Sequence, residues 1–170
     1  MKPNPTKFVD KSFLDNYGVR RGQVLLSCSG TIGRTSFVNR TLEGYCVSQH
    51  ALKITANYAG YVYAYLSTEV GKSIVKSFTY GAVIDEIEPE HLKNLPIPNA
   101  PEEIKRSIHD AVIASYDLRD QSNDLIDEAQ RLLYEALGLP EKMDLKPKYY
   151  APRAGFRCFT MSSNELNNRF

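Results

Sequence analysis

Hydrophobic and polar residues follow two different periods along the chain, which divides it into a β-rich first part and a long helical second part. Residues 23–30, QVLLSCSG, are a short apolar run that ends in glycine, as is typical of a strand. Residues 36–56 contain two more such runs around Glu43-Gly44 and predict two strands joined by a turn. Residues 81–87, GAVIDEI, predict a further strand. We therefore expect a small β-rich core.

Residues 60–78 carry both periods, because tyrosines alternate as in a strand while aliphatic residues recur every four positions as in a helix. The four-residue period lasts longer, at Val62, Leu66, Val70 and Ile74. We therefore predict a helix. The prolines of residues 95–101, LPIPNAP, exclude a helix until the next element begins.

One long helix is predicted over residues 101–137. Pro101, Glu102 and Glu103 suit a first helical turn, and Gly138 ends the helix. At about 1.5 Å per residue it is roughly 50 Å long, more than a small domain covers. We expect it to need a second helix, in this chain or another.

Small and aliphatic residues form a heptad seam along this helix, in steps of four and three. The seam consists of Ile104, Ile108, Ala111, Ser115, Leu118, Ser122, Leu125, Ala129, Leu132 and Ala136. Its small members would let a partner backbone come close, whereas an ordinary two-stranded zipper prefers large residues. The alternative is an amphipathic helix that lies on its own domain.

Composition fits a globular protein, with 42% hydrophobic residues. No apolar run approaches the roughly 18 residues of a membrane helix, and the N-terminus lacks the apolar core of a signal peptide. We therefore expect a cytoplasmic protein. The 3 cysteines show no C-x-x-C spacing, which predicts reduced, structural thiols and no zinc site.

The net charge of +1 conceals an uneven distribution. Residues 1–84 carry 10 Lys and Arg against 4 Asp and Glu, whereas residues 101–137 carry 4 against 9. A basic body that faces a polyanion, joined to an arm that faces something else, explains this pattern. Ordinary solvated surface explains it equally well.

Residues 24–37, VLLSCSGTIGRTSF, match no catalytic or nucleotide-binding motif. A Walker loop needs G-x-x-x-x-G-K-[ST], and the two glycines here are too close and lack the lysine. A nucleophile elbow needs glycine two residues before Ser29, where Ser27 stands. Ser73 and Lys76 match S-x-x-K, but the accompanying K-T-G is absent.

A strand ending in a polar turn is what these residues predict. Gly30 and Gly33 permit positive φ, and Ser27, Ser29 and Thr31 would present hydroxyls and amides beside the charge of Arg34. Such a turn suits phosphate positioning. The G-x-x-G of RNA-binding KH modules lies between helices, whereas this one follows a strand.

Ser48, Gln49 and His50 offer three consecutive hydrogen-bonding side chains. Strand alternation would send Ser48 and His50 to one face and Gln49 to the other. Glutamine reads adenine, and serine or histidine contacts bases or phosphates; the three side chains equally suit buried backbone groups. The histidines of the chain lack metal-ligand spacing, so no metal is predicted.

The segments GQVLLSCSGTIGR, VSQHALKI and GYVYAYLSTEVGKSIVKSFTYGAVIDEIEPEHLKNLPIPNAPEEIKRSI, followed by the long helix, occur in this order over roughly residues 8–137. Together they closely resemble the specificity (S) subunit of type I restriction-modification systems. In that family two target-recognition domains each precede a long helix. The two helices pair antiparallel as a spacer, and each domain reads one half of a split DNA site.

The resemblance implies an α+β fold, with a small β-rich target-recognition domain that contains short helices, followed by one long coiled-coil-type helix. Residues 1–100 would be the distal part of a recognition domain, residues 101–137 the spacer or dimerisation helix, and residues 138–170 a linker and the start of a truncated second domain. Family members usually have a longer stretch before the LLSCSGTIG strand. We therefore expect a fragment whose seam is open to a partner such as a second copy.

The implied function is non-catalytic recognition of one half of a bipartite DNA site, with scaffolding of the modification (methyltransferase) and restriction subunits. Neither an N/D-P-P-Y/F methyltransferase motif nor a P-D…E-x-K nuclease motif occurs. No cofactor is expected here, and S-adenosylmethionine, ATP and Mg are expected only on partner subunits. The expected partners are double-stranded DNA, those subunits and another copy of the long helix, with no membrane.

The candidate DNA-facing residues are Ser29, Thr31, Arg34, Gln49, His50, Lys72, Lys76 and Tyr80. Two other functions stay open. One is a helix-mediated assembly module without specific DNA binding of its own. The other is a hydrolase built on Ser29 or Ser73, for which no base or orienting partner stands at a recognisable spacing.

Overall fold

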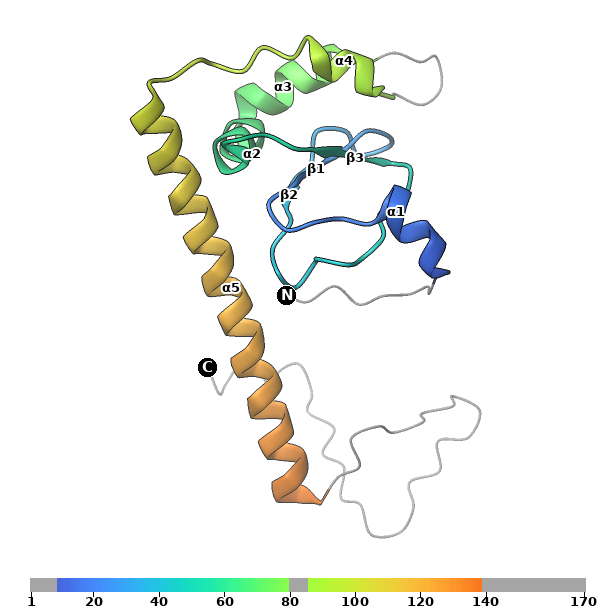
Figure 1. The fold of residues 1–170 in the computed structure, drawn as a ribbon, viewed down its shortest axis with the longest axis vertical. Coiled ribbons are helices and arrows are strands. Elements are labelled where there is room, and N and C mark those ends of the chain that lie inside the picture. Colours follow the sequence, from blue (N-terminus) through green and yellow to red (C-terminus); the bar gives the residue numbers. More distant parts are fainter. Residues whose placement is uncertain (1–8, 80–85, 139–170) are drawn as a thin grey trace, which may run out of the picture. The chain divides into compact units, whose positions relative to one another are not determined.

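The computed structural model describes residues 9–79 and 86–138, and the chain divides into two compact units, residues 1–130 and 131–170. The first unit contains a small sheet with short helices and most of the long helix (Figure 1). The described part of the second unit is the end of that helix. The elements are the 3-10 helix Lys11–Phe13, α1 (Leu14–Tyr17), β1 (Val24–Ser27), β2 (Thr35–Phe37), β3 (Ala51–Ile54), α2 (Ala59–Ser67), α3 (Glu69–Ser77), α4 (Pro89–Lys93) and α5 (Glu102–Leu137). The predicted α+β class is confirmed.

The sheet is antiparallel, with the strand order β2-β1-β3. Alternate residues of β1 are buried, so Val24 and Leu26 point to one face while Leu25 and Ser27 are only half-buried. Leu26 packs with Val62 and Leu66 of α2 and with Val75 of α3. The buried face of the sheet is therefore covered by α2 and α3.

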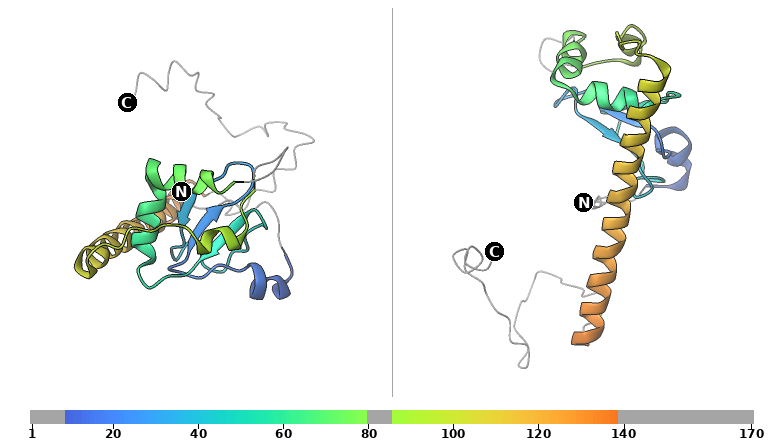
Figure 2. Two further views of the ribbon diagram at one scale, coloured as in Figure 1. Left: turned by 90° about the horizontal axis from the view of Figure 1, so that it is seen from above. Right: turned by 90° about the vertical axis from the view of Figure 1, so that its left-hand side faces the viewer.

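Helix α5 completes a second part of the core. Tyr116 of α5 packs with Val24, Phe37 and Ala59, and its ring centroid lies 5.2 Å from that of Phe37. Its hydroxyl donates to the Tyr63 hydroxyl at 2.9 Å. Burial, followed by this hydrogen bond, raises the pKa of Tyr116, so the phenol stays neutral. The first part of α5 consequently passes close to α2 and the sheet (Figure 2).

The helix predicted over residues 60–78 is two helices, α2 and α3, separated at Thr68. Thr68 has extended backbone angles, and its hydroxyl accepts a hydrogen bond from the Gly71 amide at 3.0 Å, so it caps α3. The break turns Val70 outward, where it is 63% exposed, although it shares the predicted four-residue period. The other residues of that period include the buried Val62 and Leu66.

Three of the four predicted strands are present and are shorter than predicted. Both β2 and β3 pair with β1 instead of with each other, and residues 38–50 connect them without forming a strand. Most of the strand predicted at residues 81–87 lies outside the described residues. Glu86, which is described, forms an isolated bridge with Ser29. The short helices α1 and α4 were not predicted from the sequence.

Helix α5 begins and ends as predicted. The Pro101 carbonyl accepts from the amides of Ile104 at 3.0 Å and Lys105 at 3.1 Å, and Gly138 follows the last turn with a φ of 61°. No helix within residues 9–79 and 86–138 is long and apolar enough to cross a membrane.

The predicted seam lies on the side of α5 that does not face the sheet. The residues of α5 that are buried or packed in the core are Val112, Ile113, Tyr116, Asp120 and Asn123. The seam residues Leu118 and Leu125 are instead 64% and 71% exposed. One side of the helix therefore lies on its own domain, as the alternative interpretation required, and the pairing of the seam stays a prediction.

Gly60 marks the closest approach between α2 and α5. A Cβ atom added at Gly60 would lie 2.8 Å from the His109 carbonyl oxygen and 2.9 Å from its Cα, both backbone atoms of α5. The Gly60 amide donates to Nδ1 of His109 at 3.0 Å, which joins the backbone of α2 to this side chain of α5. Only glycine allows this contact.

We predict that Gly60→Ala lowers the free energy of unfolding by about 2 kcal/mol, because overpacking against the α5 backbone outweighs the gain of about 1 kcal/mol in helix propensity. The control Gly44→Ala should cost about 1 kcal/mol, since its φ of 81° is unfavourable but nothing lies within 4 Å of the added Cβ. Urea titration followed by circular dichroism measures both. A Gly60→Ala variant as stable as Gly44→Ala would contradict this contact.

Candidate nucleic-acid interface

The polar turn after β1, residues 28–34, is held by Ser27 and is called the tip. The Ser27 hydroxyl accepts from the Arg34 amide at 2.9 Å and donates to the carbonyl of Thr31. The Ser27 amide donates to the Arg34 carbonyl at 2.9 Å. The Ser27 side chain therefore bridges Thr31 and the end of the turn at Arg34.

The tip is also anchored to the core. Gly30 and Gly33 have φ values of 71° and 84°, which confirms the predicted positive φ. Between them, Ile32 is buried in the core with Val75 of α3. Thr31 and Arg34 are left exposed. The tip is therefore a supported turn that presents a hydroxyl and a guanidinium to solvent.

Cys28 joins residues 48–50 to the tip by hydrogen bonds. The Cys28 amide donates to the His50 carbonyl at 2.9 Å, and its thiol donates to the Gln49 carbonyl at 3.5 Å. The predicted strand alternation of Ser48, Gln49 and His50 was wrong, because these residues form a turn before β3 begins at Ala51. All three are exposed.

Helix α3 meets the tip on its other side. A Cβ atom placed on Gly33 would lie 3.7 Å from the Lys72 carbonyl oxygen, so the backbones of the tip and α3 are in near contact. Lys76 is exposed one turn further on, while Lys72 forms a 2.8 Å ion pair with Glu69. That pairing lowers the pKa of Glu69, so its carboxylate keeps opposing the Lys72 charge.

The sheet end, as we call the surface formed by residues 28–34, 48–50 and 72–76, thus brings together seven of the eight predicted DNA-facing residues. These are Ser29, Thr31, Arg34, Gln49, His50, Lys72 and Lys76. The eighth, Tyr80, lies outside the described residues. Segments far apart in the sequence meet here because β1 pairs with β3 and packs under α3. Whether these residues contact DNA stays a prediction.

The sheet end has no arrangement that favours bond breaking. Burial raises the pKa of Cys28, so its thiol is protonated and is a poor nucleophile. Among residues 9–79 and 86–138, no group of three or more His, Cys, Asp or Glu could hold a metal ion. The surface can offer hydroxyl, amide, imidazole and cationic groups, which are binding groups for phosphates and base edges.

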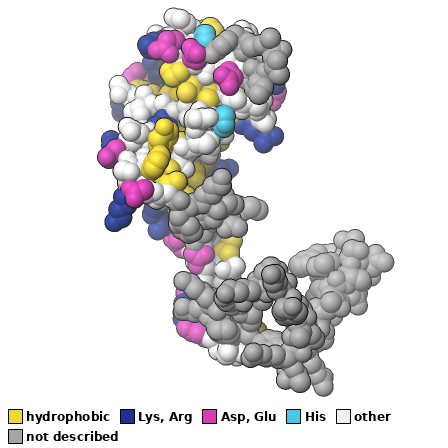
Figure 3. Space-filling view, turned by 90° about the vertical axis from the view of Figure 1, so that its right-hand side faces the viewer, with side chains coloured by type: hydrophobic (Ala, Val, Ile, Leu, Met, Phe, Trp, Pro, Cys, Tyr) yellow, Lys and Arg dark blue, Asp and Glu magenta, His cyan; other side chains and the backbone are white. Residues whose placement is uncertain are grey.

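A groove of about 440 Å³ lies on the side of the body formed by α1, β3 and α4. Its lining includes Tyr17, Leu52, Ile54 and Leu92, and it reaches Gln49 of the sheet end. Figure 3 shows hydrophobic side chains gathered on this face. No local sequence pattern marks this groove, because its walls come from three separate segments.

Comparison with known proteins identifies one relevant fold. No family model matches the sequence, and no curated protein matches it. Among solved structures, the chain is similar to a crystal structure of a type I restriction-modification system S subunit from M. genitalium, with a TM-score of 0.50 and 16% sequence identity. The similarity covers 72% of this chain and 33% of that one, so the chain spans about a third of the length of that subunit. At this identity the similarity shows a shared fold.

Proposed function

We propose that this chain recognises DNA as part of a type I restriction-modification complex, in the manner of an S subunit. The observation that carries the proposal is the meeting of three polar and basic segments at one end of a sheet, in a fold shared with a type I S subunit. The basic composition of residues 1–84 supports attraction to phosphates.

The recognition is proposed to be non-catalytic. The chain would read one half of a bipartite site and scaffold the modification and restriction subunits, which would hold S-adenosylmethionine, ATP and Mg. This places the protein in the cytoplasm, where its DNA and partner subunits are. The exposed hydroxyls and amides of the sheet end would contact bases, while Arg34 and Lys76 would contact phosphates.

We predict that Arg34→Ala weakens binding to a DNA duplex and reduces the slope of log K against log salt by about 1, because one phosphate contact is lost. Lys105→Ala is the matched control, since this lysine lies on α5 away from the sheet end and pairs with Glu102 at 3.5 Å. Fluorescence anisotropy over a range of salt concentrations gives both slopes. Equal slopes for Arg34→Ala and the unchanged protein would remove Arg34 from the interface.

A helix-mediated assembly function is favoured by a separate observation. The seam residues Leu118, Leu125 and Leu132 are 64%, 71% and 51% exposed. Exposed leucines at heptad spacing along one helix are typical of a helix-pairing surface. We propose that the seam pairs with α5 of a second copy, which would join two sheet ends in one particle. The two functions are compatible, and the assembly function alone requires no DNA contact.

We predict that the chain forms a dimer and that Leu125→Glu makes it monomeric, because a buried glutamate in the paired seam would lack a partner. Gln130→Glu is the control, since it adds the same charge at an exposed position of α5 outside the seam. Light scattering after size-exclusion chromatography gives the mass, and circular dichroism checks that the helix remains. A monomeric unchanged protein would refute self-association through the seam.

A further inference from the structure

Asp120 is a buried carboxylate on the side of α5 that faces the sheet. It is 3% exposed, one turn from Tyr116, which is buried against Phe37. A buried carboxylate is costly unless hydrogen bonds replace its lost water. The hydrogen bonds that Asp120 accepts therefore decide whether its burial is tolerated.

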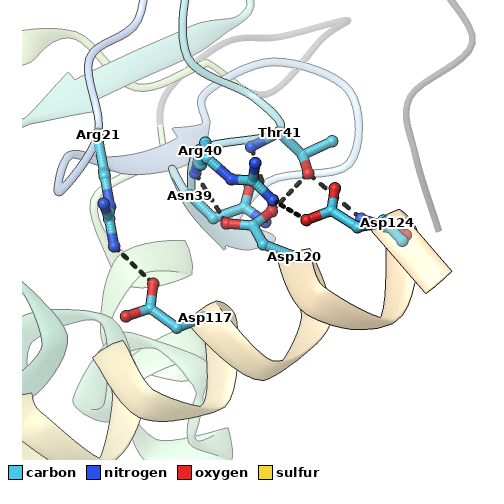
Figure 4. A network of polar contacts seen from close by, with 8 residues as sticks. Arg21, Asn39, Arg40, Thr41, Asp117, Asp120 and Asp124 are labelled. Carbon is cyan, nitrogen blue, oxygen red and sulfur yellow. Dashed lines mark hydrogen bonds and ion pairs between the residues drawn. The ribbon is translucent and has the colours of Figure 1, made fainter.

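The segment Asn39, Arg40 and Thr41, called the cradle, surrounds Asp120 with donors (Figure 4). Oδ2 of Asp120 accepts from the Arg40 amide at 3.0 Å. Oδ1 accepts from the Asn39 side-chain amide at 2.7 Å, from the Thr41 amide at 3.2 Å and from the Thr41 hydroxyl. Two successive backbone amides that point at one anion form a nest, a site that fits a single carboxylate.

Two ion pairs flank this contact, and unlike Asp120 their side chains are exposed. Arg40 pairs with Asp124 at 2.5 Å, and Arg21 pairs with Asp117 at 2.6 Å. All four side chains are between 41% and 57% exposed, so solvent screens both pairs and each contributes little. Of Asp117, Asp120 and Asp124, only Asp120 is buried.

We propose that Asp120 is the positioning residue that fixes the sheet at one place along α5. If the cradle moved by one helical turn, about 5.4 Å, to receive Asp124, Asp120 would occupy the place of Tyr116 against Phe37 and would be buried away from the donors of the cradle. If it moved by one turn in the other direction, Tyr116 would face the cradle and leave its two backbone amides unpaired. Both shifts bury unsatisfied polar groups, so one register is strongly preferred.

The positioning of the sheet by Asp120 would matter for DNA recognition, and that consequence rests on the proposed function. If α5 is the spacer between two DNA-reading surfaces, then the place at which each sheet sits on its helix determines the distance between the two half-sites. The positioning of the sheet on α5 is itself independent of DNA. The following experiment therefore contains no DNA, and its failure is distinct from failure of DNA recognition.

The test compares Asp120→Ala with Asp117→Ala, an exposed carboxylate removed from the same side of the same helix. Spin labels are attached at Asn94→Cys and Gln130→Cys. Pulsed electron paramagnetic resonance then measures the distance between the sheet-bearing part and α5. The native cysteines are replaced by Cys28→Ala, Cys46→Ser and Cys158→Ser in every variant. Amide hydrogen exchange at Arg40 and Thr41 reports the contact directly.

We expect Asp120→Ala to broaden or shift the distance distribution and to accelerate exchange of the two cradle amides by about tenfold or more. Asp117→Ala should leave the distances unchanged. A merely stabilising role for Asp120 would lower the urea midpoint without altering the distances of the folded protein, and that result would overturn the proposal. If Asp120→Ala does not fold, Thr41→Val replaces it, because this variant removes one of the donors to Asp120. We expect Thr41→Val to broaden the distance distribution, and an unchanged distribution would also overturn the proposal.

Discussion

Packing of Tyr116 and Asp120 against the sheet is the interaction on which the rest of the structure depends. A sheet of three short strands buries little apolar area by itself, and the aromatic side chain of Tyr116 completes the core around Val24 and Phe37. The carboxylate of Asp120 then satisfies the amides of the loop that follows β2. Apolar burial holds α5 against the sheet and the polar contact sets its register, so α5 is part of the body's core.

The sheet end follows from the same framework. Cys28, at the end of β1, is the point where the tip, residues 48–50 and the segment that begins at Glu86 meet through backbone hydrogen bonds. Because Ser27 and Ile32 hold the tip from within, Thr31 and Arg34 can remain exposed without the turn losing its shape. Rigid support beneath exposed polar groups is what a surface that reads DNA requires.

The sequence predicts those features that depend on local patterns. Pro101, Gly138 and the heptad spacing define α5, and the glycines define the tip, because capping and backbone freedom are properties of neighbouring residues. The break at Thr68 had a local signal, a capping residue followed by Glu69, that the four-residue period concealed. The Asp120 cradle could not be predicted, since its partners lie about 80 residues apart. Its local sequence signal is no more than an aspartate one turn after Tyr116.

Titration of an isotope-labelled chain with a short DNA duplex, followed by nuclear magnetic resonance, tests the proposed contact between the sheet end and DNA. We expect the amide shifts to concentrate in residues 28–34, 48–50 and 72–76, to weaken as salt is added, and to be absent from α1 and from the seam of α5. Shifts confined to the groove beside β3 or to α5, or no shifts at low salt, would contradict it.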